Sequence, residues 1–249
     1  MTTRSRRLSA RWIGLPFALV LCVISGCNER RFGGLEAIRE HGEIRVAIRP
    51  GFLESSPPPN EEGDQKTQLR HLAARIGAEI RWVEPESNDL LIETLESGRA
   101  DLMVSRFSAA PLLGTGSVPT APVEWVADFI VASSKMPELT LEDLRGGQVH
   151  VQLSGLNPAA RSALEDLKLE VVPVPESLSA EEVLEQVSNG AIPLTVTDSG
   201  IIERTPDTDS LQLFGPITER RPVVWAVRAD NLQLRRAIDD FIFAEKVLT

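Results

Sequence analysis

Several residue types are scarce in this chain, and each scarcity excludes a class of protein. The 249 residues include two cysteines, three histidines and no tyrosine. Two cysteines cannot form a disulfide framework, so the fold must be stabilised by a packed core. The histidines are far apart and have no spacing typical of a metal site, so we expect no metal and no other cofactor. The sequence also lacks a glycine-rich phosphate loop, a nucleophile elbow and a cysteine–histidine pair, so we expect no catalytic residue.

Basic residues are fewer than acidic ones. The chain has 26 lysine and arginine residues against 36 acidic residues, which gives a net charge of −10 at pH 7. Proteins that bind nucleic acid usually carry a basic patch or stripe, so the charge balance argues against a nucleic-acid partner. An acidic protein is also repelled by anionic lipid headgroups, so we expect any membrane attachment to depend on a lipid anchor.

An apolar run near the N-terminus, Trp12–Ile24, is shorter than the roughly 20 residues that a membrane-spanning helix needs. It follows four arginines and precedes small residues, an order typical of a secretory signal. Ile24–Cys27 resembles the bacterial lipoprotein box, in which the cysteine thiol receives diacylglycerol and signal peptidase cuts before it. We therefore predict a signal peptide over residues 1–26, lipidation at Cys27 and a polar tether over 27–34. An ordinary signal with a chance cysteine is the alternative.

The residue after Cys27 indicates the membrane to which the predicted lipoprotein would be sorted. Asn28 stands where an aspartate typically retains lipoproteins at the inner membrane of Gram-negative bacteria. The sequence therefore predicts a protein anchored on the periplasmic side of a bacterial membrane, with the outer membrane favoured if the source has two. We also expect the protein to be a monomer.

From Leu35 onward, short strands alternate with short helices that carry clear capping signals. Asn157 and Pro158 open one predicted helix, and Ser179 with Glu182 forms a capping box for another. A stretch rich in proline and glycine, 111–122, is expected to be a loop. This alternation predicts an α/β fold with parallel-rich sheets flanked by helices.

Six motifs in order resemble the family 3 extracellular solute-binding proteins. The strand ending at Asp198 and the later Trp225–Val227 are most similar to the sensor lobe of the F-type membrane-bound lytic transglycosylases. The motifs are Gly42–Ala47, Leu95–Leu102, Leu141–Gly146, Val187–Gly190, Thr195–Ser199 and Trp225–Arg228.

This resemblance implies a two-lobed type II periplasmic-binding-protein fold with two crossing hinge segments. Lobe 1 would comprise residues 35–129 and 215–249, and lobe 2 residues 130–214. A small-molecule ligand would bind in the cleft between them, and a permease or another envelope protein would be the partner. The catalytic glutamate of the transglycosylases belongs to a separate domain after the sensor lobe, so the resemblance implies that this chain is not an enzyme.

The carboxylate clamp of the family's amino-acid binders is not kept. Leu113 falls at the position of the clamp arginine, so Arg106 or Arg49 would have to supply the positive charge. Asp198 stands where the family places a carboxylate on the ligand's amino group, although an aspartate there is also a good helix cap. An exposed surface position is the alternative for Arg106.

Two further ligand-binding residues are implied by the resemblance. Ser154 falls where the second lobe binds anions at a helix N-terminus, with a plain turn serine as the alternative. Trp125, with Trp225, would form an apolar wall of the cleft, but the alternating strand around Trp225 favours core packing for that residue.

The sequence thus predicts a lipid-anchored, non-catalytic solute-binding protein for an amino acid, a peptide or a cell-wall fragment, acting in transport or sensing. Two alternatives stay open. One is an orphan sensor lobe that no longer binds ligand and acts as a protein-interaction module. The other is an enzyme on the same fold, similar to the periplasmic cyclohexadienyl dehydratases, with Asp198 as its acid or base.

Overall fold

The computed structural model describes residues 34–49, 65–87, 90–106, 109–153, 155–205 and 207–248. The described residues belong to one compact unit. The predicted signal peptide and lipidation site lie outside the described residues, as does the predicted tether except for its last residue. Within the described ranges, no helix has the length and apolar character needed to cross a membrane.

The first sheet of this unit combines parallel and antiparallel strands in the order β2-β1-β3-β10-β4. The strand β1 (Glu43–Ile48) pairs in parallel with β2 (Glu79–Val83) and β3 (Leu102–Val104). The strand β10 (Arg221–Arg228) runs antiparallel to β3 and to the edge strand β4 (Ser117–Val126). We call this sheet and its helices the first lobe.

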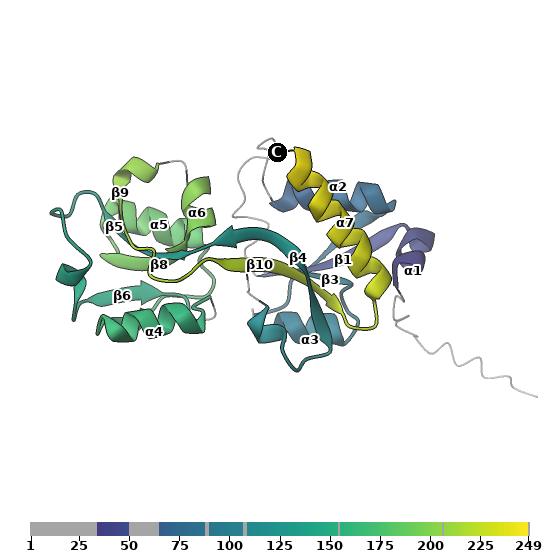
Figure 1. Ribbon diagram of the computed structural model, residues 1–249, viewed down its shortest axis with the longest axis horizontal. Helices are drawn as coiled ribbons and strands as arrows, with labels where there is room; N and C mark the ends of the chain where they lie inside the picture. The colour runs from purple at the N-terminus through teal and green to yellow at the C-terminus, as the bar shows by residue number, and fades with distance from the viewer. Residues whose placement is uncertain are drawn as a thin grey trace, which may run out of the picture. The chain divides into compact units, whose positions relative to one another are not determined.

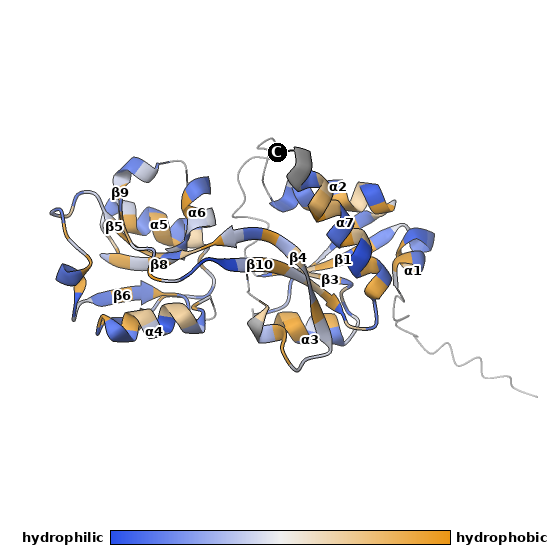
Figure 2. Cartoon of the chain, in the orientation of Figure 1, coloured by the Kyte–Doolittle hydropathy of each residue, from blue (hydrophilic) through white to orange (hydrophobic). Residues whose placement is uncertain are grey.

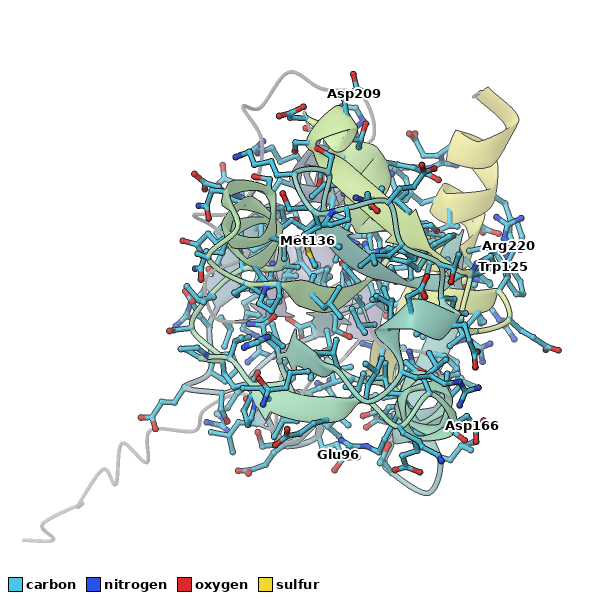
Figure 3. The ribbon with its side chains drawn as sticks, turned by 90° about the vertical axis from the view of Figure 1, so that its left-hand side faces the viewer. Glu96, Trp125, Met136, Asp166, Asp209 and Arg220 are labelled. Atoms are coloured by element: carbon cyan, nitrogen blue, oxygen red, sulfur yellow. The ribbon has the colours of Figure 1, made fainter. Side chains whose placement is uncertain are left out.

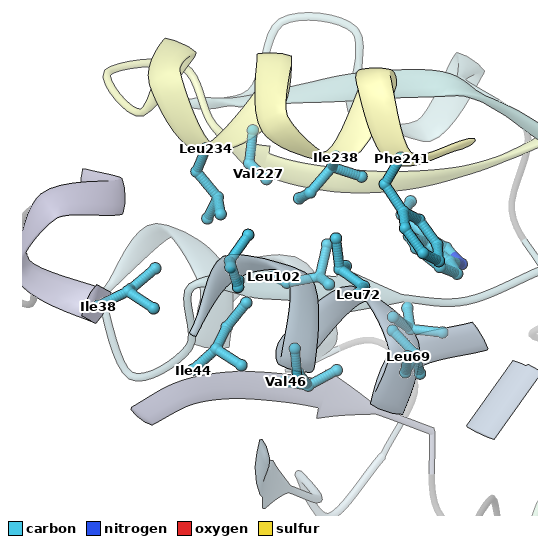
Figure 4. Close-up of a cluster of buried hydrophobic side chains, with 14 of the residues drawn as sticks. Ile38, Ile44, Val46, Leu69, Leu72, Leu102, Val227, Leu234, Ile238 and Phe241 are labelled. Carbon is cyan, nitrogen blue, oxygen red and sulfur yellow. The ribbon is translucent and has the colours of Figure 1, made fainter. Parts of the chain in front are cut away.

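Helices cover both faces of the first sheet (Figure 1). Along β1, Ile44 and Val46 face a cluster that includes α2 and α7, whereas Ala47 belongs to a second cluster with α3. Figure 4 shows Leu72 of α2 and Ile238 of α7 meeting over the strands. The helices of this lobe are α1 (Gly34–His41), α2 (Gln65–Ile76), α3 (Leu90–Glu96) and α7 (Leu232–Leu248), with a short 3₁₀ turn at Ala110–Leu112.

The second sheet repeats this arrangement in the order β7-β6-β8-β5-β9. Here β6 (Gln148–Val151) pairs in parallel with β7 (Glu170–Pro173) and β8 (Leu194–Asp198). The strand β5 (Asp128–Ser133) runs antiparallel to β8 and to the edge strand β9 (Leu211–Phe214). We call this sheet and its helices the second lobe.

Local sequence signals explain the helices of the second lobe. The Ser179 side chain accepts a hydrogen bond from the Glu182 backbone amide, and the Glu182 carboxylate accepts one from the Ser179 backbone amide. The predicted capping box is therefore confirmed. The Asn157 side chain caps an earlier helix in the chain, which has Pro158 in its first turn, as predicted. The helices are α4 (Pro158–Asp166), α5 (Ala180–Asn189) and α6 (Ser199–Arg204), with 3₁₀ turns at Glu142–Leu144 and Thr208–Ser210.

The chain passes between the two sheets twice. It leaves β4 and enters β5 across Ala127, and it leaves β9 and enters β10 across residues 215–220. Figure 2 shows that the approach to β10 is hydrophilic, in contrast to the apolar strand interior that follows. The two-lobed fold with two crossing segments is therefore confirmed, while the exact lobe bounds given by the sequence stay predictions.

One part of the sequence-based description was wrong. The stretch 111–122 is not all loop, because β4 begins at Ser117 and contains Pro119 and Pro122. Proline cannot donate to a sheet ladder but is tolerated on an edge strand, and β4 lies at an edge. Each sheet contains both parallel and antiparallel pairs, because β5 and β10 arrive from the opposite lobe and run antiparallel to their neighbours.

Candidate functional site

A cavity of about 130 Å³ lies where the two sheets meet. Residues from both lobes line it, and many of them follow or end the parallel strands β1, β3, β6 and β8. The polar lining residues are Arg49, Ser105, Arg106, Asp128, Gln152, Asn157, Thr195, Thr197, Asp198 and Arg221. The other lining residues are Val151, Gly155, Leu156, Ala160, Ala180, Val183, Val196 and Ile201.

A bidentate ion pair between Arg106 and Asp198 joins the two lobes at the cavity. Arg106, just after β3, donates from Nε to Asp198 Oδ2 at 2.9 Å and from Nη2 to Oδ1 at 2.5 Å. Asp198 ends β8 and also caps α6, because Oδ1 accepts a hydrogen bond from the Ile201 backbone at 3.1 Å. The helix cap that the sequence offered as the alternative for Asp198 is therefore present, and the same carboxylate pairs with Arg106. The bidentate geometry is the strong form of an arginine–carboxylate contact.

Further charges extend this pair. Arg106 Nη1 donates to Glu124 Oε2 of β4 at 3.1 Å, and Glu124 Oε1 lies 3.5 Å from Arg204 of α6. Arg221, at the start of β10, lies 3.7 Å from Asp198 Oδ2. Positive and negative groups of the two lobes thus alternate across the contact.

Asp128, at the start of β5, anchors the crossing strands. It receives two hydrogen bonds from Arg221, at 3.1 and 3.4 Å, one from Thr218 at 2.9 Å and one from Asn157 at 2.8 Å. Because Asn157 is the cap of α4, this carboxylate connects a helix start of the second lobe to both crossing segments.

Gly200, in α6, makes the close approach of the lobes possible. A methyl group at this position would clash with the Glu124 carboxylate and would lie 2.8 Å from Arg106 Nη2. The absence of a side chain therefore lets two charged groups of the first lobe reach the start of α6.

The surrounding groups shift the pKa values of the ion pair. Burial alone would raise the pKa of Asp198, but the positive charges of Arg106 and Arg221 hold it below its usual range. Burial would lower the pKa of Arg106, but Asp198 and Glu124 raise it. Both groups of the pair are therefore charged at neutral pH.

Arg49, after β1, is in a different environment. Burial is the main reason why its pKa lies below the usual arginine value, and Arg106 also lowers it. Glu181 of α5, 3.8 Å away, opposes this shift. Arg49 therefore has a looser carboxylate contact than Arg106 has.

Two threonine hydroxyls on β8 line the cavity, and they differ in their hydrogen bonding. Thr195 Oγ1 on β8 donates to the His150 carbonyl at 2.7 Å. Thr197, two residues along the same strand and only 7% exposed, has no hydrogen-bond partner for Oγ1 among the described residues. Buried hydroxyls are usually paired, so Thr197 marks a position where a ligand atom is expected.

Solved structures share this architecture. An amino acid ABC transporter substrate-binding protein from Streptococcus pneumoniae, bound to L-arginine, is 19% identical with a TM-score of 0.64, over 85% of this chain and 92% of that one. An ancestral amino acid-binding protein, a precursor of cyclohexadienyl dehydratase, is 19% identical with a TM-score of 0.67, over 86% and 93%. The chain has the fold of the type II periplasmic amino acid-binding proteins.

Curated relatives of this binding-protein fold agree with the sequence resemblance. The chain is 26% identical over 231 residues to membrane-bound lytic murein transglycosylase F of Desulfosudis oleivorans, covering 85% of this chain and 47% of that protein. It is 25% identical over 217 residues to the protein of the same name from Sodalis glossinidius, covering 83% and 46%. The chain thus spans about half the length of the curated relatives it matches. No family model matches it.

Only some of the ligand-binding residues predicted from the sequence line the cavity. Arg106, Asp198 and Arg49 line the cavity, and the first two bind each other. Ser154 lies outside the described residues. Trp125 is 48% exposed and is not among the lining residues.

The environment of Trp125 is instead the outer side of the crossing strands. Figure 3 shows it beside Arg220, whose Nη2 donates to the Trp125 carbonyl at 3.2 Å. Trp225 is fully buried in the core of the first lobe, as the alternating strand around it indicated.

Sequence reasoning missed Asp128, Arg221 and Thr197 as lining residues. Asp128 and Arg221 each stand at the start of a crossing strand, and only the pairing of the sheets brings them together. Thr197 directly precedes Asp198 at the end of a strand, which was the one signal for it.

Proposed function

We propose that this chain is an extracytoplasmic solute-binding protein that holds a small polar molecule in the cavity between its lobes and catalyses no reaction. The amino acid-binding fold and the relatedness to transglycosylase F support a solute-binding role. The observation that carries the proposal is the cavity itself, which combines charged groups from both lobes with an apolar lining.

Its position also supports the proposal. In open α/β sheets, ligands bind beyond the carboxyl ends of the strands. Arg49, Arg106 and Gln152 follow parallel strands of the two sheets, and Asp198 ends another. A ligand there would contact both lobes at once, so binding would be coupled to their separation.

The proposal is tested by thermal unfolding of the purified protein with a panel of amino acids, small carboxylic acids, short peptides and muropeptides. A ligand present at 100 times its dissociation constant stabilises the folded state by about 2.7 kcal/mol. We expect a rise in melting temperature with at least one small compound. If no compound on the panel raises it, the solute-binding function is rejected.

We further propose that Cys27 carries a lipid anchor and that the binding lobes are held at a bacterial membrane, where a permease or another envelope protein receives the signal or the solute. The membrane-bound character named for the relatives supports this location. In cell fractionation, wild-type protein should be found in the membrane, preferably the outer one where there are two, and the Cys27→Ala variant should not. Equal membrane association of both proteins would reject the anchor.

A second candidate is an interaction module that no longer binds ligand. The observation in its favour is that Arg106 and Asp198, the charged residues expected to contact a ligand, bind each other. The cavity favours solute binding instead, because a cleft that has lost its ligand has no need for a buried, unpartnered hydroxyl such as that of Thr197.

A dehydratase-like enzyme fits the site less well. An acid or base must be free to exchange a proton with a substrate. Asp198 is held in its charged form by Arg106 and also caps α6, so it is poorly suited to that role. Product formation from arogenate or prephenate, lost in Asp198→Asn, would favour the enzyme.

A further inference from the structure

The carboxylates that line the cavity have their acceptor positions filled by the protein. A carboxylate offers about four lone-pair positions. Asp198 is contacted twice by Arg106, once by the Ile201 backbone and, at 3.7 Å, by Arg221. Asp128 accepts four hydrogen bonds from the three side chains described above. A ligand ammonium group therefore finds no unoccupied carboxylate among the described residues that line the cavity.

The size of the cavity is the second constraint. Its volume is about 130 Å³. An engineered cavity of about 150 Å³ in another protein holds benzene, which has six non-hydrogen atoms. Arginine, with twice that number, is too large for the cavity as it stands.

The third observation is that the lobes already touch through charged groups. Arg106 and Glu124 of the first lobe reach Asp198 and Arg204 of the second, and Gly200 has no side chain to obstruct them. This contact satisfies the charges that a zwitterionic ligand would otherwise satisfy.

We propose that the Arg106–Asp198 pair holds the lobes together and so limits the cavity to carboxylate-bearing molecules of about six non-hydrogen atoms that carry no ammonium group. This inference rests on the proposed solute-binding function and specifies its ligand. It distinguishes the chain from its structural neighbours that are bound to arginine.

The remaining lining groups suit such a ligand. Arginines outnumber acidic residues among the lining side chains by three to two. The Arg49 guanidinium group lies 3.8 Å from Glu181, and a ligand carboxylate can compete with Glu181 for it. The Thr197 hydroxyl is placed to pair with a polar ligand atom.

The test is a calorimetric titration of the purified full chain with L-lactate, L-alanine and L-arginine. L-lactate and L-alanine share a carbon skeleton and differ in a hydroxyl against an ammonium group. We expect L-lactate to bind, L-alanine to bind at least about tenfold more weakly, and L-arginine not to bind. The proposal is overturned if L-alanine or L-arginine binds as tightly as L-lactate, or if L-lactate does not bind.

The Asp198→Asn variant tests the pair itself. Asparagine caps a helix as well as aspartate does, so the change removes the charge and retains the cap of α6. With Arg106 released, we expect L-lactate to bind about tenfold more tightly than to wild type. A loss of L-alanine binding in this variant, from a wild type that binds it, would show that Asp198 receives a ligand ammonium group and would overturn the proposal.

The two proposals fail in different ways. If the thermal-unfolding panel yields a ligand with an ammonium group, solute binding stands and the proposed ligand class is wrong. If no compound on that panel or in the titrations binds, solute binding is rejected together with the ligand class.

Closure without ligand is tested by small-angle X-ray scattering of the ligand-free full chain. Gly200→Ala places a methyl group where the Glu124 carboxylate and Arg106 Nη2 lie, so these side chains must move away from α6 and their contacts with the second lobe weaken. We therefore expect a larger radius of gyration than in wild type. Glu203→Ala, at an exposed position of the same helix, is the control and should match wild type. Equal radii for all three proteins would contradict a closed ligand-free state.

Discussion

Two arginine–aspartate pairs of this protein have nearly the same geometry and very different surroundings. Arg45 of β1 donates from Nε and Nη2 to Asp101, just before β3, at 3.0 and 2.8 Å, and its backbone amide also donates to Asp101. This pair lies within one lobe, with side chains 9% and 0% exposed. Arg106 and Asp198 form the same fork, but between two lobes and with side chains 17% and 5% exposed.

The comparison shows that geometry alone does not define the role of an ion pair. Breaking the Arg45–Asp101 pair leaves a buried charge between two paired strands, where water cannot reach it without unfolding the sheet. Breaking the Arg106–Asp198 pair allows the lobes to separate and each charge to be hydrated, while both cores stay intact. The first pair stabilises the fold, and the second is suited to compete with a ligand.

The largest expected effect is therefore at Asp101. Asp101→Asn removes the charge opposite the buried Arg45 guanidinium group. We expect the free energy of unfolding in urea to fall by about 3–5 kcal/mol. A loss below about 1 kcal/mol would show that water reaches this pair and would remove the contrast between the two sites.

The same substitution at Asp198 should cost less. The α6 cap is retained, so the change reports on the charged hydrogen bonds, and we expect a loss of about 1–3 kcal/mol in urea unfolding. Arg106→Gln should give a loss at least as large, because it removes the contact with Asp198 and also the hydrogen bond to Glu124. A loss as large as that of Asp101→Asn would mean that the lobes cannot separate without unfolding.

The dependence on pH sharpens this comparison. The pKa of Asp198 is lowered in the folded protein by Arg106 and Arg221, so its contribution is complete above the unfolded-state pKa of about 3.9 and is lost as the pH falls below it. The difference in unfolding free energy between wild type and Asp198→Asn should be constant from about pH 5 to 8 and shrink below about pH 4. A change in this difference between pH 6 and 8 would assign the effect to another group.

The smallest expected effect is at Trp125. Its side chain is half exposed and does not line the cavity, so Trp125→Ala should change stability by no more than about 0.5 kcal/mol and leave L-lactate binding unchanged. The buried Trp225 is the matched contrast, with an expected loss of about 3–5 kcal/mol on truncation to alanine. Weaker L-lactate binding by Trp125→Ala would instead support the sequence-based expectation that Trp125 forms an apolar wall of the ligand site.

Local signals in the sequence predicted most of the fold. The caps at Asn157 and Ser179 and the apolar spacing of α2 act within a few residues, so one sequence suffices to find them. The strand β4 was missed because Pro119 and Pro122 normally exclude a strand, and only its place at a sheet edge permits them. That place depends on β10, about one hundred residues later.

The candidate site was predicted in part for the same reason. Arg106 was found because it follows the end of a strand, and Asp198 because it ends a strand in a motif with a known place in the family. Their pairing was not predicted, because it joins residues 92 positions apart across two sheets. Asp128 and Arg221 carry no local signal and become neighbours only through the two crossings.

The account depends most on the cavity being a ligand site, and titration of the Thr197→Val variant with L-lactate tests this directly. Valine has the shape of threonine without the hydroxyl, and the lost hydroxyl has no partner among the described residues, so the fold should be retained. We predict that the variant binds L-lactate about tenfold more weakly than wild type does. Equal binding by the two proteins would contradict a ligand in this cavity.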